Sequence, residues 1–361
     1  MIIGHGGNTQ DLATRLGCSV DDIIDMSSNL NPLGPPEFIE QVICDNLSLI
    51  KALPEPDAIS MRKGFARFYN MDVNRVIAGN GTTWFIYTLP LALGCKKVLI
   101  AGPTYSDYKD ACQMHQVLFE HCHANASEGF IPNVDRLSNM AQWADIVFIC
   151  NPNNPTGSLM SKDRLVFLIK QHPDTIFVID ESYLPFVDQA REISLASEAS
   201  FDNLIVLSSM SKIFCIPGLR TGFLSTCESL ARKIMAHYQP WSVNALAQSV
   251  IKYIFDHPER IEPFYDQTRT YITAEKKLFL EQLAGLDGLE LFDSATCFIL
   301  ARLTGKLRSS SFCEQVGQDR LLIRDCSNFV GLSDQYVRFS LKDRAINQRL
   351  ADRIKQVVDH D

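Results

Sequence analysis

The sequence predicts an α/β fold in which a large domain, built on a mainly parallel sheet flanked by helices, is joined to a smaller α+β domain. Three observations predict it. Short apolar runs alternate with helix-like segments through the middle of the chain. These runs hold Val, Ile, Leu and Phe without polar alternation, which is typical of strands buried on both faces. Beyond about residue 240 the pattern changes to long helical periodicity followed by short strand-like runs.

The expected elements can be placed in order along the chain. The clearest strands of the large sheet lie at residues 97–101, 144–150, 175–180 and 203–209. Helical periodicity is expected over residues 244–284, and strands of a separate small sheet at residues 289–303, 321–324 and 335–341. We therefore predict an N-terminal arm that is part of the small domain, a large domain and a small C-terminal domain at residues 1–35, 36–240 and 241–361.

Composition narrows the class of protein. The chain has 34 Lys and Arg against 42 Asp and Glu, a net charge of −8, which argues against nonspecific nucleic-acid binding. No apolar stretch is long enough to span a bilayer, and no secretory signal is recognisable, so neither a membrane nor a secreted protein is expected. The 11 cysteines are scattered without a CxxC pair, as in a reducing compartment, and the cytoplasm is the expected location.

One triplet needs a check as a metal site. His121 and His123 flank Cys122, and strand alternation would place both imidazoles on one face. Structural zinc normally takes four ligands, and no further Cys/His cluster lies nearby in the sequence. We interpret the triplet as a solvated strand end and predict no metal.

Polar side chains follow four of the predicted strands. In open α/β sheets, ligands bind beyond the carboxyl ends of the strands. The four strands deliver to this edge, in order, an aromatic ring, an amide, a carboxylate and an amine, those of Tyr105, Asn154, Asp180 and Lys212. Asp180 alone could be a helix cap and Lys212 alone a surface lysine, while the loops at 79–83 and 151–157 could be plain turns. Those readings do not predict all four features together in this order.

The set describes a phosphorylated ligand. A helix beginning near Gly81, Thr82 and Thr83 offers free N–H groups to an anion, and Ser209 and Arg220 on either side of Lys212 can complete the shell around a phosphate.

The other half of the ligand is an aldehyde-bearing aromatic ring. Lys212 can form a Schiff base with the aldehyde, and Asp180 can pair with a protonated ring nitrogen. Asn154 and Tyr183 can hydrogen-bond a ring hydroxyl, and Tyr105 can stack on the ring. The predicted cofactor is pyridoxal 5′-phosphate (PLP).

The motifs NPNNPTG (151–157), DESY (180–183) and SSMSKIFCIPGLRTG (208–222) resemble those of fold-type-I PLP enzymes, the aminotransferase classes I and II, over nearly the full chain. Within this group the chain resembles the L-threonine-O-3-phosphate decarboxylases of cobalamin biosynthesis more than the histidinol-phosphate aminotransferases. The segments that favour the decarboxylases are 5–8 with 27–34, 240–247 and 322–332.

The resemblance implies the PLP-dependent transferase fold (type I), a homodimer and a set of residue roles. Lys212, Asp180 and Tyr105 are the expected catalytic residues. The expected cofactor-binding residues are Gly81, Thr82, Thr83, Tyr105, Asn154, Asp180, Tyr183, Ser209, Lys212 and Arg220. Arg338 matches the arginine that binds the substrate carboxylate. Arg324, His5 and Asn29 match groups around the substrate phosphate, and Asn154 also faces the substrate.

One position departs from the family pattern. Relatives usually carry a tyrosine before the Asp57 region, and that tyrosine reaches the cofactor phosphate of the neighbouring subunit. Leu53 stands in its place here. A lost hydrogen bond to a charged group costs roughly 1.5–3 kcal/mol, so weaker PLP binding or a substitute donor is expected.

The expected reaction is decarboxylation of L-threonine O-3-phosphate, or of L-serine O-phosphate, to an amino-alcohol phosphate and CO₂. A histidinol-phosphate-type aminotransferase would use the same residues with another substrate orientation. A non-catalytic PLP-binding module is the alternative of a different class. A nicotinamide-dependent dehydrogenase is rejected, because the turn at 79–81 has no third glycine at the spacing that a dinucleotide needs.

Overall fold

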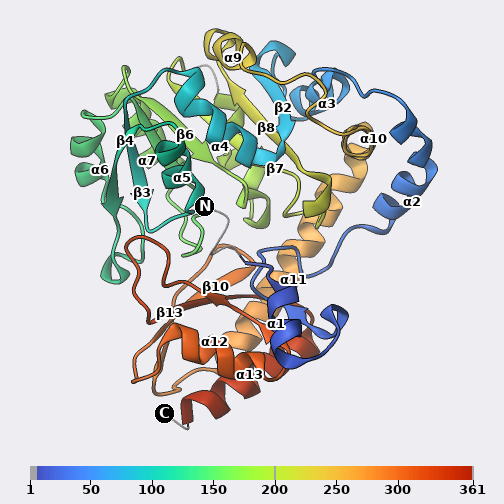
Figure 1. Cartoon of the computed structure of the whole chain (residues 1–361). Helices are drawn as coiled ribbons and strands as arrows, with labels where there is room; N and C mark the ends of the chain where they lie inside the picture. Colours follow the sequence, from blue (N-terminus) through green and yellow to red (C-terminus); the bar gives the residue numbers. More distant parts are fainter. Residues whose placement is uncertain (1–5, 199–200, 360–361) are drawn as a thin grey trace.

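The computed structural model describes residues 6–198 and 201–359, so the prediction for His5 falls outside the described residues. A seven-stranded sheet forms the centre of the larger part (Figure 1). Its strands, in spatial order, are β2 (Val76–Asn80), β8 (Thr221–Thr226), β7 (Leu204–Ser209), β6 (Ile176–Asp180), β5 (Ile146–Cys150), β3 (Lys97–Gly102) and β4 (Leu118–His123). The strands from β7 to β4 pair in parallel, whereas β8 is antiparallel to both of its neighbours.

Helices cover both faces of this sheet, because successive residues of its buried strands point to opposite sides. Phe148 and Val178 join one core cluster, and Val147 and Phe177 join another. The helices of this part are α2 (Glu37–Asp45), α3 (Ile59–Phe68), α4 (Gly81–Ala92), α5 (Asp107–Met114), α6 (Val134–Ala141), α7 (Lys162–Gln171), α8 (Ala190–Ile193) and α9 (Glu228–Met235).

The smaller part lies below the large sheet in Figure 1. Its antiparallel sheet has the order β12 (Arg324–Asp325), β13 (Tyr336–Ser340), β10 (Phe298–Leu303) and β9 (Leu289–Leu291). A separate parallel pair joins the N-terminal strand β1 (Ile24–Asp25) to β11 (Leu321–Leu322). The helices of this part are α1 (Thr9–Leu16), α12 (Ser309–Gly317) and α13 (Arg344–Asp359).

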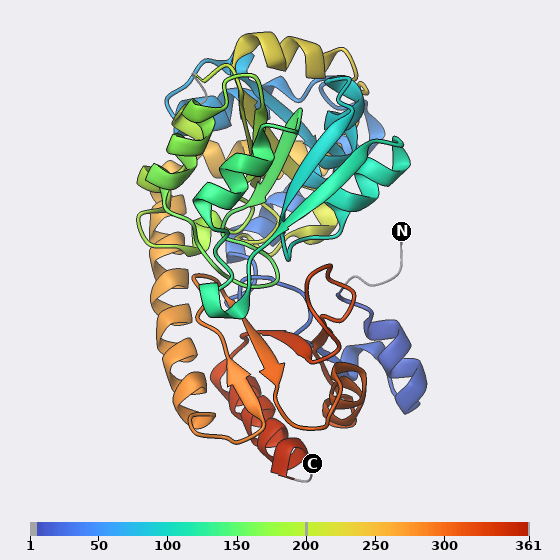
Figure 2. The same cartoon turned by 90° about the vertical axis from the view of Figure 1, so that its left-hand side faces the viewer.

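Two helices connect the parts. The helix α10 (Ala245–Asp256) lies beside α2 and α3, and the long helix α11 (Ile261–Gln282) runs from the larger part to the smaller one (Figure 2). The predicted α/β architecture with a second, smaller sheet is therefore confirmed. The exact domain boundaries at residues 35 and 240 stay predictions.

Several element predictions need correction. The helical region at 244–284 is two helices, because His257 ends α10 and Pro258 opens a short 3₁₀ turn before α11. The predicted strand at 289–303 is two strands separated by a turn, and the one at 321–324 divides between two sheets. No described helix is long and apolar enough to cross a membrane.

The His121–Cys122–His123 triplet lies on β4, at the edge of the sheet. The two imidazole rings are parallel with centroids 5.1 Å apart, and their Nδ1 atoms are buried without a hydrogen-bond partner. The interpretation as a solvated strand end is therefore wrong. Burial lowers the pKa of His121 to about 4, so the ring is neutral at pH 7. Among residues 6–198 and 201–359 no group of three or more His, Cys, Asp or Glu is placed to hold a metal.

Candidate active site

A cavity of about 630 Å³ opens at the carboxyl ends of the parallel strands. It brings together residues that lie up to 139 positions apart, from Gly81 to Arg220. All ten residues predicted for the cofactor line it. The full lining is Gly81, Thr82, Thr83, Tyr105, Tyr108, Cys150, Asn154, Asp180, Ser182, Tyr183, Ser209, Ser211, Lys212 and Arg220.

The end of the cavity at α4 has the shape of an anion cup. Gly81 opens the helix with φ of +76°, and a side chain there would meet Arg220 Nη2 at 2.8 Å. Gly222 on β8 faces the same turn so closely that a Cβ atom would lie 2.5 Å from the Thr82 nitrogen. Because Gly81 and Gly222 have no side chain, the backbone of β8, the guanidinium of Arg220 and the N-terminus of α4 can lie close together. Free N–H groups at a helix start beside an arginine suit a phosphate group.

The amine and the carboxylate that the sequence predicts both lie in this cavity and are buried. Burial raises the pKa of Asp180, and hydrogen bonds from Ser182 and Tyr108 act in the opposite direction. Burial lowers the pKa of Lys212, and the charges of Arg338 and Arg220 lower it further. A lysine with a lowered pKa has a larger neutral fraction, which is the form that attacks an aldehyde.

The partners of Asp180 include a residue that the sequence reasoning missed. Tyr108 donates its hydroxyl to Asp180 Oδ2 at 2.8 Å. Ser182 donates its backbone N–H and its hydroxyl to Oδ1, at 3.0 and 2.5 Å. Tyr108 lies in the first turn of α5, whereas Tyr105 precedes the helix, and no residue pattern in the sequence links Tyr108 to Asp180.

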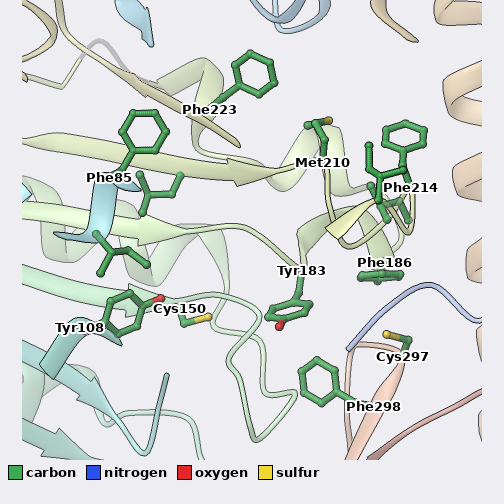
Figure 3. Close-up of a cluster of buried hydrophobic side chains, with 14 of the residues drawn as sticks. Phe85, Tyr108, Cys150, Tyr183, Phe186, Met210, Phe214, Phe223, Cys297 and Phe298 are labelled. Carbon is green, nitrogen blue, oxygen red and sulfur yellow. The ribbon is translucent and has the colours of Figure 1, made fainter. Parts of the chain in front are cut away.

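Polar groups from the N-terminal segment, from the loop after β6 and from β13 meet at Tyr183. Asn29 donates to the Tyr183 hydroxyl at 3.2 Å, and Ser340 donates to Asn29 at 3.0 Å. Asn154 accepts a hydrogen bond from Arg338. Tyr183 itself is buried, with its ring against Phe298 (Figure 3). Through Asn29, the N-terminal segment therefore connects Tyr183, which follows β6 of the large sheet, to Ser340 of β13.

A second cavity of about 550 Å³ adjoins the first and shares Tyr105, Asn154, Tyr183 and Lys212 with it. It adds residues that the sequence reasoning missed, among them the Ser27–Ser28 pair and Phe329. The predicted substrate residues Asn29, Arg324 and Arg338 line it as well. The structure thus brings together every described residue that the sequence predicts for the substrate.

The two arginines of this cavity are direct cross-strand neighbours in the β12–β13 pair. Both are buried, at 9% and 4% exposure. Arg338 donates to neutral groups, the Asn154 amide oxygen and, at 2.7 Å, the Ser27 carbonyl. The guanidinium of Arg324 lies 5.2 Å from the centre of the Phe329 ring. Like charges directly opposite one another repel, so the pair favours an anionic ligand.

Leu53, which replaces the family tyrosine, is 75% exposed in the segment before α3. It has no hydroxyl to offer, and it does not line either cavity. The effect of this replacement on PLP binding stays a prediction.

Comparison with known proteins places the chain among PLP enzymes. The family model for aminotransferase class I and II matches residues 21–354. An adenosylcobalamin biosynthesis bifunctional protein from Leptospira interrogans is 28% identical over 359 residues; the chain is 98% covered but spans only 41% of that protein. Threonine-phosphate decarboxylase from Salmonella typhimurium is 28% identical, with 98% of this chain and 96% of that protein covered. Histidinol-phosphate aminotransferase from Methanocaldococcus jannaschii is also 28% identical, with 93% and 89% covered.

Solved structures agree with this placement. L-threonine-O-3-phosphate decarboxylase from Porphyromonas gingivalis superposes with a TM-score of 0.81 at 31% identity, covering 92% of this chain and 99% of that one. A histidinol-phosphate aminotransferase from Sinorhizobium meliloti, solved in complex with pyridoxal-5′-phosphate, has a TM-score of 0.84 at 16% identity, with 98% and 94% covered, and shares the fold. The anion cup, the buried lysine and the buried carboxylate of the first cavity fit that cofactor.

Proposed function

This chain belongs to the aminotransferase class I and II family of PLP-dependent enzymes, and on that premise we propose that it decarboxylates a phosphorylated amino acid. The proposed substrate is L-threonine O-3-phosphate or L-serine O-phosphate, and the products are an amino-alcohol phosphate and CO₂. The proposed setting is the synthesis of the cobalamin side chain in the cytoplasm, as a homodimer.

The observation that carries the proposal is the buried arginine pair. Arg324 and Arg338 are cross-strand neighbours in a cavity that also exposes Lys212. A phosphorylated amino acid brings two anionic groups, a carboxylate and a phosphate, to a reacting amine. Histidinol phosphate brings only the phosphate. Two adjacent guanidinium groups suit a substrate that carries two anionic groups, as a phosphoamino acid does by itself, whereas an aminotransferase would fill both only with its dicarboxylate oxo acid.

Each residue of the two cavities has a proposed task. Gly81, Thr82, Thr83, Ser209 and Arg220 would hold the cofactor phosphate, and Asn154 and Tyr183 its ring hydroxyl. When bound, PLP takes up the electron pair that the broken bond leaves on the substrate carbon. Asp180 keeps a positive charge on the ring nitrogen by remaining ionised beside it.

The remaining tasks concern the substrate and a proton. Arg338 would bind the carboxylate, Arg324 and Asn29 the phosphate, and Tyr105 would limit the tilt of the ring. Which bond of the substrate carbon breaks depends on the orientation that these contacts impose. The Nζ atom of Lys212, whose pKa burial lowers, can hold and return the proton that replaces the carboxylate.

A product assay tests this proposal. The purified enzyme is given threonine phosphate, serine phosphate or histidinol phosphate, each with and without 2-oxoglutarate, and CO₂ and glutamate are measured. We expect CO₂ from a phosphoamino acid without any oxo acid. Glutamate formed from histidinol phosphate and 2-oxoglutarate, without CO₂ release, would instead make the protein an aminotransferase.

A matched variant addresses the non-catalytic alternative. Lys212→Ala removes the amine while the rest of the cavity remains. We expect the visible absorbance of the bound cofactor to change and turnover to be lost. If the wild-type protein binds PLP but, like the variant, turns over none of the three substrates, the result would support the non-catalytic binding module.

A further inference from the structure

The carboxylate of Asp180 is held at both of its oxygen atoms by different side chains. Ser182 donates to Oδ1, and the hydroxyl of Tyr108 donates to Oδ2 at 2.8 Å. Asp180 is only 4% exposed and Tyr108 is fully buried. A buried carboxylate with donors on both oxygens has its plane fixed as well as its charge stabilised.

The ring of Tyr108 has little freedom. It stacks on Phe148 of β5, with centroids 4.9 Å apart and an angle of 15° between the planes. The ring also lies edge-on to Tyr105, with centroids 5.9 Å apart and an angle of 86° between the planes. Figure 3 shows the hydroxyl end of Tyr108 beside Cys150. A phenol has a single donor, and here the packing of its ring directs that donor to Asp180.

We infer that Tyr108 is a positioning residue, whose hydroxyl keeps Asp180 ionised and oriented toward the cofactor ring nitrogen. It acts through Asp180 and touches no reacting atom of the substrate. Its contact with Tyr105 also supports, from behind, the residue predicted to stack on the ring. The inference depends on the PLP cofactor and on the proposed role of Asp180, and it holds for either proposed reaction.

The physical reason is a competition for one proton. Between the ring nitrogen and Asp180, that proton can lie on the nitrogen, which gives an ion pair, or on the carboxylate, which gives a neutral pair. Burial favours the neutral pair. Hydrogen bonds to the carboxylate favour the ion pair: burial raises the pKa of Asp180, and the bonds from Ser182 and Tyr108 oppose that rise. Without the Tyr108 hydroxyl the proton shifts toward the carboxylate, and the ring becomes a weaker electron acceptor.

The test measures the position of that proton and needs no substrate. Apoenzyme is loaded with PLP labelled with ¹⁵N in the ring, and the ¹⁵N chemical shift is recorded for wild type and Tyr108→Phe. We expect a pyridinium signal in the wild type and a clear displacement toward neutral pyridine in the variant. Tyr265→Phe is the matched control, since Tyr265 is also a buried tyrosine but lies on α11 outside the cofactor cavity. An unchanged shift in Tyr108→Phe overturns the inference.

Kinetics on whichever substrate is turned over give a second measure. We expect kcat to fall roughly 10- to 100-fold in Tyr108→Phe, the range of a lost hydrogen bond to a charged group, while KM changes by less than about threefold. A fall confined to KM would contradict a role through Asp180. Failure of every substrate would sink the proposed reaction and leave the ¹⁵N result standing.

A conservative replacement separates the hydroxyl from the packing of the ring. Incorporation of 3,5-difluorotyrosine at position 108 keeps both the ring and a hydroxyl that donates more strongly. We expect a pyridinium signal and a kcat within about threefold of wild type, which corresponds to about 0.6 kcal/mol. If this protein behaves like Tyr108→Phe, ring packing and not the hydrogen bond is responsible, and the inference fails. The same protein serves if Tyr108→Phe does not fold.

Discussion

Two buried arginines at directly opposed strand positions are the most informative residue-scale feature of the substrate cavity. Neighbouring cations destabilise a sheet unless something compensates them. Arg338 donates to an amide oxygen and a carbonyl, which carry no full charge. A cavity that holds such a pair beside Lys212 suits an anionic ligand.

Arg324→Gln tests this at a single residue. We expect KM for threonine phosphate to rise roughly 10- to 100-fold, the range of one lost charged hydrogen bond, with kcat less affected. Slow turnover of threonine, which has no phosphate, should not change. Steady-state kinetics on both compounds provide the measurement.

The control for this variant is Arg302→Gln on the neighbouring strand β10. Arg302 pairs with Glu290 at 2.6 Å, but both side chains are about two-fifths exposed, at 39% and 41%. A surface pair of this kind is worth about 0–1 kcal/mol, so KM should stay near the wild-type value. An equal rise of KM for phosphorylated and unphosphorylated threonine in Arg324→Gln would show that Arg324 does not bind the phosphate.

Glu181, the residue after Asp180, should make the stability of the folded protein depend on pH. Its carboxylate is buried and accepts hydrogen bonds from Ser194 Oγ at 2.5 Å and from the Leu195 nitrogen at 2.7 Å. Burial raises its pKa to about 7. The folded state therefore keeps a proton that the unfolded state releases between pH 4.5 and 7. Stability from this group is fully present below pH 4.5, falls as pH rises, and is lost above about pH 7.

Glu181→Gln removes this titration. We expect the free energy of unfolding of wild type to fall relative to the variant by up to about 3 kcal/mol between pH 4.5 and 8. Urea unfolding of both proteins at the two pH values gives the difference, in which the titration of other groups cancels. Parallel pH profiles for the two proteins would show that Glu181 stays ionised in the folded state.

The residues of the cofactor cavity could be predicted from sequence because each lies in a short local motif. Lys212, Asp180 and Asn154 each follow a recognisable buried strand, and parallel strands end at one edge. Tyr108 and the arginine pair could not be predicted in the same way. The Tyr108–Asp180 bond joins residues 72 positions apart, and the pairing of Arg324 with Arg338 depends on strand register.

At the scale of elements, the meeting of β8 with the start of α4 determines the shape of the anion cup. β8 is antiparallel to β2, and their pairing brings Gly222 opposite Gly79, just before the Gly81 turn. Only a residue without Cβ allows this approach, because the added atom would lie 2.5 Å from the Thr82 nitrogen. The pairing of β2 with β8 therefore determines the space that is available for a phosphate at the start of α4.

The substitution Gly222→Ala should push β8 away from the start of α4 and so distort the anion cup. Overpacking of this kind costs about 1–3 kcal/mol, which corresponds to roughly 5- to 150-fold weaker PLP binding. Titration of the apoenzyme with PLP, followed by absorbance, measures the Kd. Gly218→Ala is the matched control in the same segment, since nothing lies within 4 Å of its added Cβ. Equal Kd values for the two variants would contradict the close approach.

The sequence predicted four apolar strands of the large sheet and missed β2, β4 and β8. The strands β3, β5, β6 and β7 are continuous apolar runs and were expected. The strand β4 (LFEHCH) alternates between exposed and covered residues because it forms the edge of the sheet. The antiparallel insertion of β8 between β2 and β7 is a long-range pairing for which residue patterns give no sign.

At the scale of the whole molecule, one group of large apolar side chains is exposed. It consists of exposed side chains around the segment before α3, those of Leu47, Leu49, Ile50, Leu53 and Trp241. The Trp241 nitrogen donates to the Pro56 carbonyl, and Asn244 donates to the Leu219 carbonyl, next to Arg220 of the cup. Contiguous exposed apolar groups of this kind are typical of a protein interface.

The predicted homodimer would cover this surface with a second copy of the chain. Leu53→Asp places a charge on its most exposed member, at 75% exposure. We expect light scattering to give a mass near 81 kDa for wild type, twice the 40.6 kDa of one chain, and near 40.6 kDa for the variant. PLP content should fall with the mass, because the Asn244–Leu219 hydrogen bond connects the segment that holds Trp241 to Arg220 of the cup. Phe167→Asp is the control, since Phe167 is 48% exposed on α7, on the other side of the molecule in Figure 1. A Leu53→Asp protein that keeps the mass and the PLP content of the wild type would place the subunit contact elsewhere.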